Sequence, residues 1–134
     1  MGPDMCMERN YAAANVVGGK IYVAGGCKGC DKSNWMEVFD AKMHIWELVS
    51  CPMKDLCGCD ICISAGMNGK VFTFGKGNAV GKCRGLAYLP KENTWTQALW
   101  EADIGSYKVI KNVLYYYHSG EFEWKDIRKR IGVI

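Results

Sequence analysis

The chain has 134 residues, of which 49% are apolar and 23% are charged, and its formal net charge is +3. This balance is typical of a globular domain and excludes an intrinsically disordered chain. The net charge is too small to indicate a nucleic-acid partner, because domains of that kind concentrate basic residues in one stripe. No run approaches the roughly 20 apolar residues that span a bilayer, and no signal peptide is visible. We therefore expect no membrane association and a cytoplasmic or nuclear location.

After an N-terminal tail at 1–8, residues 9–53 predict a first unit of four short antiparallel strands. The strands are expected at 11–17, 21–24, 35–39 and 46–48, where apolar residues alternate between turn residues. Gly25 and Gly26 end the second strand, and paired glycines permit the positive φ and close backbone approach of a crowded position in a twisted sheet.

Residues 54–103 predict a second unit with the same order of strands, at 61–65, 71–74, 84–89 and 95–100. Its first two strands flank Asn68 and Gly69, a pair that is favoured in tight hairpins. Residues 104–127 begin a third unit, with strands expected at 107–110, 113–117 and 121–124. The fourth strand of this unit is missing, and 128–134 is left as a C-terminal tail.

The first two units repeat each other at a period of about fifty residues. Trp46 follows Phe39 by seven residues, and Trp95 follows Tyr88 by the same spacing. A period of this size indicates a propeller or a solenoid. Because the aromatic pairs recur at one spacing, we expect them to pack between neighbouring sheets rather than to form a ligand-stacking box.

The first unit closely resembles a kelch repeat. It reads Gly-Lys-Ile-Tyr-Val-Ala-Gly-Gly at 19–26 and Glu-Val-Phe-Asp at 37–40, followed by Trp46 and by Pro-Met at 52–53. From about residue 9 to about residue 127, the chain is similar to the plant F-box/kelch-repeat proteins. The later units depart from the pattern, since 75–77 lacks the paired glycines and Lys125 replaces an aromatic residue.

The resemblance implies an all-β fold: a partial kelch-type β-propeller with two four-stranded blades and an incomplete third. Closed propellers have at least four blades, so this one is expected not to close. Both end blades should then expose apolar surface, which favours self-association.

In the family that the chain resembles, an F-box helix bundle docks onto the adaptor of a cullin ubiquitin ligase, and the kelch propeller binds the protein to be ubiquitinated. Nothing similar to an F-box precedes Tyr11, so the resemblance implies a protein-interaction module without the ligase-docking part. Loops on a rigid scaffold commonly carry binding residues. The candidate contact for an unknown protein partner is therefore the loop at 27–34, with Lys28, Asp31, Lys32 and Asn34. The alternative is a truncated gene product without activity.

Eight cysteines raise a further alternative, a small β domain stabilised by zinc. Cys27 with Cys30 and Cys59 with Cys62 form two Cys-x-x-Cys pairs, which can hold a tetrahedral zinc ion. However, 28 residues separate the pairs, and Cys62 lies within an expected strand. We expect reduced thiols, no metal and no cofactor. Two histidines and the lack of any nucleophile placed beside a base argue against an enzyme.

Overall fold

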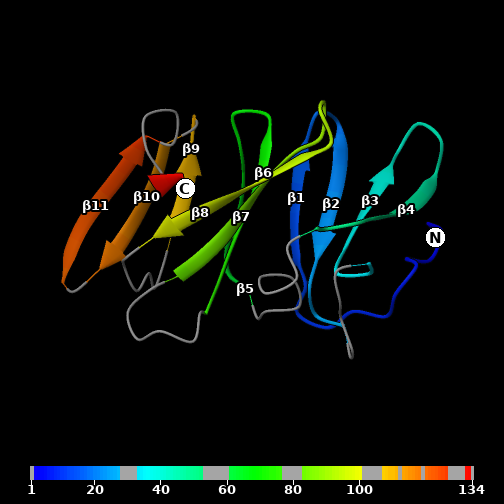
Figure 1. Cartoon of the computed structure of the whole chain (residues 1–134), viewed down its shortest axis with the longest axis horizontal. Coiled ribbons are helices and arrows are strands. Elements are labelled where there is room, and N and C mark those ends of the chain that lie inside the picture. Colours follow the sequence, from blue (N-terminus) through cyan, green and yellow to red (C-terminus); the bar gives the residue numbers. More distant parts are fainter. Residues whose placement is uncertain are drawn as a thin grey trace.

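The computed structural model describes residues 2–27, 33–52, 61–76, 83–100, 107–111, 113–118, 120–126 and 132–133. Within these ranges the chain forms β-strands and no helix, as the all-β prediction requires. The strands build three antiparallel sheets that stand side by side in sequence order (Figure 1). The sheets do not close into a ring, which confirms the prediction of a partial propeller.

The first sheet is a meander in which each strand pairs with the next along the chain. Gly18 and Gly19 form the first hairpin with φ values of 59° and 76°, a backbone that favours glycine. Tyr11, which the sequence assigns to the first strand, instead lies outside it and is 99% exposed. The strands of this sheet are β1 (Ala13–Val17), β2 (Lys20–Ala24), β3 (Met36–Asp40) and β4 (Ile45–Val49).

The second sheet repeats the meander and adds one short strand from the C-terminal region. Gly132 and Val133 pair with Leu99 and Ala98 at the outer edge of β8, a pairing for which the sequence shows no signal. This strand covers part of an edge that would otherwise leave backbone groups unpaired. The strands of this sheet are β5 (Ile61–Met67), β6 (Lys70–Lys76), β7 (Cys83–Leu89), β8 (Thr94–Trp100) and β12 (Gly132–Val133).

The third sheet has three strands in the part of the chain that the structure describes, β9 (Tyr107–Ile110), β10 (Val113–His118) and β11 (Glu121–Asp126). Its two faces differ. Leu114 and Tyr116 on one face are 0% and 2% exposed, whereas Phe122 and Trp124 on the other are 64% and 65% exposed. The third sheet is therefore packed on one side only.

The second sheet is the middle layer of the stack. Val71 and Thr73 on one face of β6 are buried, and so are Phe72 and Phe74 on the other. At its inner edge β5 contacts β1 of the first sheet and β9 of the third. Burial on both faces explains why β6 reads as a nearly continuous apolar run rather than as an alternation.

An apolar cluster joins the first and second sheets. Tyr22 and Tyr88 meet across it with ring centroids 6.0 Å apart and planes inclined by 61°. The Asn15 side chain on β1 donates a hydrogen bond to the Ser64 hydroxyl on β5, so the inner strands are also tied by a polar contact. The buried members of the cluster are Tyr22, Ala24, Trp35, Met36, Val49, Cys51, Val71, Leu86 and Tyr88.

Candidate functional site

The repeated aromatic pairs lie at matching places in the first two sheets. Phe39 faces Trp46 across β3 and β4 with ring centroids 5.0 Å apart. Tyr88 faces Trp95 across β7 and β8 with ring centroids 4.6 Å apart. Tyr88 belongs to the cluster between the first two sheets, and Trp95 packs against that cluster. Each aromatic pair is therefore a cross-strand contact between neighbouring strands of one sheet.

The paired glycines at the end of β2 bring the N-terminal segment against the first sheet. Gly25 and Gly26 have φ values of 75° and 73°. A Cβ atom on Gly26 would lie 2.5 Å from the Asn10 carbonyl oxygen, and the Asn10 N–H donates to the Gly26 carbonyl at 2.8 Å. A side chain at Gly26 would therefore displace the segment that precedes β1.

Arg9 and Glu37 form an ion pair inside this junction. The Arg9 Nη2 and Glu37 Oε2 atoms are 2.9 Å apart, and the side chains are only 1% and 0% exposed. The Cys6 N–H donates to the second carboxylate oxygen, Glu37 Oε1, at 2.8 Å. Sequence reasoning did not assign a role to either charged residue, although a glutamate among apolar residues in a predicted strand is a signal that could have identified one of them.

The Arg9 guanidinium also holds the loop that follows β2. It donates to the Gly25 carbonyl at 2.9 Å before the loop, and to the Asn34 and Trp35 carbonyls at 2.6 and 2.9 Å after it. Gly25 and Trp35 are further joined by a backbone hydrogen bond of 2.8 Å. One buried cation thus clamps both ends of the loop at a fixed separation.

The candidate loop lies partly outside the described residues. Lys28, Asp31 and Lys32 lie outside the described residues. Asn34 is half-buried, and its carbonyl oxygen is the acceptor for Arg9 just mentioned. The structure therefore describes Cys27, Ser33 and Asn34 of this loop.

The cysteines correct one expectation. Cys27 and Cys51 each take part in a disulfide bond, whereas reduced thiols were expected, and Cys6 is a free thiol. A disulfide needs Cα atoms within about 7 Å, a proximity that the spacing of cysteines in a sequence does not reveal. Cys30 and Cys59, from the proposed zinc set, lie outside the described residues. Among the residues that are described, no group of three His, Cys, Asp or Glu side chains could hold a metal ion.

A groove runs along the seam between the first two sheets, beneath the turn that joins β7 and β8. Its larger cavity has a volume of about 440 Å³ and its smaller one about 370 Å³. Ser50 and Asn93 line both, so the two cavities adjoin. Burial raises the pKa of the Tyr22 and Tyr88 hydroxyls, with a further rise at Tyr22 from its proximity to Tyr88. Both phenols therefore stay protonated at neutral pH.

The described part of the chain contains no helix of the length and apolarity needed to cross a membrane.

Comparison with known proteins gives one consistent result. The model of the FKB95 kelch-repeats domain matches residues 1–132. An F-box/kelch-repeat protein of Arabidopsis thaliana is 48% identical over 135 residues, covering 97% of this chain and 33% of the relative. A second such protein of the same plant is 40% identical over 132 residues, covering 96% and 34%. The chain spans about a third of the length of these relatives.

Proposed function

Because the chain belongs to the family of FKB95 kelch-repeats domains, we propose that it binds a protein partner through the loop at 27–34, in the manner of the substrate-binding part of an F-box/kelch ubiquitin-ligase adaptor. The kelch repeat is a protein-interaction fold. The similar plant proteins are named F-box/kelch-repeat proteins, after the F-box and the kelch repeat. Fold alone does not fix function, so the proposal rests on a feature of this chain.

That feature is the clamp at the base of the loop. A binding loop that is held at both ends loses less conformational entropy when a partner docks. Arg9 provides such a clamp from a fully buried position, with hydrogen bonds to backbone carbonyls on both sides of the loop. The loop itself carries charged side chains of both signs, which suits a polar protein surface. We propose binding without catalysis.

The test is a competition experiment with a longer relative. The chain and the F-box/kelch-repeat protein that is 48% identical to it are expected to compete for the same substrate protein. Adding the chain to a reconstituted ubiquitination reaction should lower modification of that substrate. A triple variant, Lys28→Ala, Asp31→Ala and Lys32→Ala, should lose this inhibition, whereas Lys111→Ala, at an exposed turn of the third sheet, should keep it. Equal inhibition by both variants would contradict the proposal.

A second interaction is favoured by the open face of the third sheet. Phe122, Trp124 and Ile110 are 64%, 65% and 54% exposed there, and the ring of Tyr115 stacks on Phe122 at 6.0 Å. Contiguous apolar surface of this kind marks an interaction site. We propose that it pairs with the same face of a second copy.

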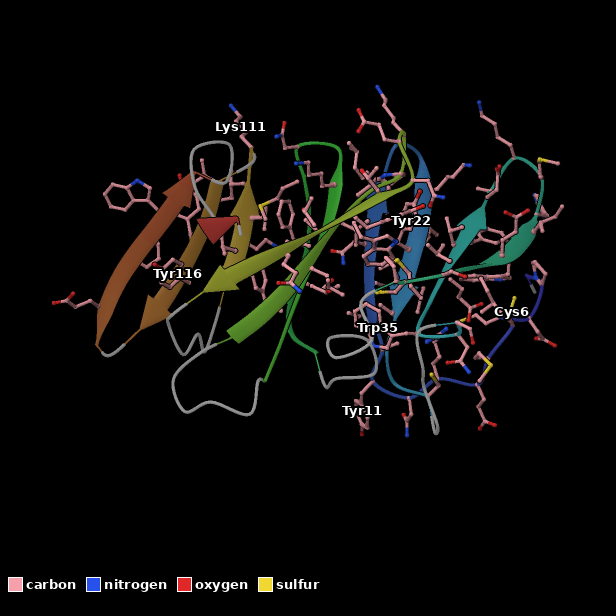
Figure 2. All side chains as sticks on the ribbon, in the orientation of Figure 1. Cys6, Tyr11, Tyr22, Trp35, Lys111 and Tyr116 are labelled. Atoms are coloured by element: carbon pink, nitrogen blue, oxygen red, sulfur yellow. The ribbon has the colours of Figure 1, made fainter. Side chains whose placement is uncertain are left out.

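The first sheet, at the other end of the stack, explains why the open third-sheet faces of two copies would pair with each other. The N-terminal segment lies along the outer side of the first sheet, where Figure 2 shows Cys6. There the Trp46 indole N–H donates to the Pro3 carbonyl at 3.0 Å, and Arg9 is buried against Glu37. Because the N-terminal segment covers part of this end, a closed two-fold dimer is favoured over head-to-tail stacking of copies, although Val16 and Leu48 on the same face are 68% and 47% exposed.

A further inference from the structure

The larger cavity of the seam groove is polar, and its tyrosines are rigidly placed. Tyr22 and Tyr88 are 5% and 6% exposed, and both line the cavity. The Tyr88 hydroxyl donates to Asn93 Oδ1 at 2.9 Å, so its oxygen remains able to accept. Figure 2 shows Tyr22 at the junction of the first two sheets. The floor of the cavity therefore offers phenolic oxygens that cannot move away from a ligand.

Among the described residues, one charge in the groove has no ion-pair partner. Lys20 lies 3.8 Å from Asp40 Oδ2, so the cation on the cavity wall already has an anionic partner. Glu47, on the same face of the first sheet as Tyr22, is exposed and lines the cavity. No cation of the described residues lies within ion-pair distance of it. The groove thus presents one free carboxylate together with several hydroxyl and carbonyl acceptors.

The adjoining smaller cavity is apolar. Trp95, Pro52 and Cys51 line it, and it shares Ser50 and Asn93 with the polar cavity. A chain lying along the groove could place a charged side chain in one cavity and, two residues away, an apolar side chain in the other, since alternate side chains of an extended segment point to the same side, about 7 Å apart.

We propose that the seam groove binds an arginine or lysine side chain from an extended segment of a protein partner, with the apolar side chain two residues away seated against Trp95. The guanidinium or ammonium group pairs with Glu47 and donates to the tyrosine and Ser50 hydroxyls, which are all acceptors at neutral pH. The site rests on the proposed function, because it requires a protein partner. Its smaller cavity borders Ser33 of the loop at 27–34, so the site extends the binding surface from that loop to the seam.

The probe is a library of random heptapeptides, selected on the immobilised chain and then measured by fluorescence anisotropy. Enriched peptides are expected to contain arginine or lysine two residues from an apolar residue. Replacing that arginine by citrulline, a neutral analogue of nearly the same shape, should weaken binding by about tenfold, as expected for loss of a charge-assisted hydrogen bond. Glu47→Gln should weaken binding of the parent peptide by a similar factor.

The decisive comparison combines both changes. If Glu47 is the partner of the basic residue, the citrulline peptide binds wild type and Glu47→Gln equally well, because the interaction is already lost. Glu121→Gln, an exposed carboxylate on β11, should leave every affinity within twofold of wild type. Equal weakening by citrulline on wild type and Glu47→Gln would overturn the proposal, as would a selection that enriches no basic peptides.

The same variant separates this site from the proposed function. If Glu47→Gln still inhibits ubiquitination in the competition experiment while no basic peptide binds the groove, the interaction module stands and the seam site falls. If the loop variant and Glu47→Gln both inhibit as well as wild type, the proposed function falls on its own test.

Discussion

Gly66 shows how a single residue permits the sheets to stack. A Cβ atom built at this position on β5 would lie 2.9 Å from the Val16 carbonyl oxygen and 2.9 Å from Val17 Cγ2 on β1. The obstacle is partly backbone of the neighbouring sheet, which cannot rotate away. Glycine is therefore required here for close approach.

Gly66→Ala should destabilise the chain by about 1–3 kcal/mol, because the inner strands of two sheets would have to separate. The free energy of unfolding in urea is the measurement. Gly2→Ala is the matched control, since nothing lies within 4 Å of its added Cβ. If both alanine variants unfold at the wild-type urea concentration, β1 and β5 do not approach as described.

Glu37 is the second residue on which stability depends. Glu37→Gln keeps the size of the side chain but leaves the Arg9 cation, 1% exposed, without its anionic partner. Removing one partner of a buried ion pair lowers the free energy of unfolding by about 3–5 kcal/mol. Glu47→Gln, at an exposed carboxylate of the same sheet, should change stability by less than about 0.5 kcal/mol. Equilibrium unfolding of both variants checks this, and similar midpoints would contradict the buried pair.

At the scale of elements, the strands were largely predictable and the contacts between them were not. Short apolar runs bounded by glycine turns place β2 and β6 within a few residues of their observed bounds. The Arg9–Glu37 pair joins positions 28 residues apart, and its partners are set by the path of the N-terminal segment. The seam groove likewise depends on how side chains of two sheets meet, which periodicity does not encode.

The turn between β3 and β4 is held by a carboxylate. Asp40 Oδ1 accepts backbone N–H groups of Lys42 at 2.9 Å and Met43 at 3.3 Å. The Lys42 hydrogen bond is the main cause that lowers the pKa of Asp40 below its ordinary 3.8. The folded form holds the Asp40 proton less tightly than the unfolded chain does. The Asp40 carboxylate therefore contributes to the free energy of unfolding at pH values above its ordinary pKa.

The stabilisation by Asp40 should disappear as the pH falls through its lowered pKa. We expect Asp40→Asn to be less stable than wild type at pH 6 and to approach wild-type stability well below pH 3.8. Urea unfolding of both proteins across this range measures the difference. A gap between them that stays constant with pH would show that the carboxylate charge plays no part in the turn.

At the scale of the whole molecule, the stack is asymmetric. The middle sheet is buried on both faces, the first sheet is partly covered on its outer side by the N-terminal segment, and the third sheet is open. Each aromatic side chain exposed on the open face offers roughly 100 Å² or more of apolar surface. A few such side chains supply only part of the about 800 Å² per partner of a typical interface, so a dimer of moderate affinity is expected.

The measurement that tests this account most directly is size-exclusion chromatography with light scattering on wild type and on Trp124→Ser. Wild type should elute as a concentration-dependent dimer, because the open face of the third sheet finds the same face of a second copy. Trp124→Ser should be monomeric with unchanged β-sheet content, since Trp124 is 65% exposed and its loss leaves no cavity. A wild-type chain that stays monomeric at all concentrations, or a Trp124→Ser variant with the same mass as wild type, would contradict the account.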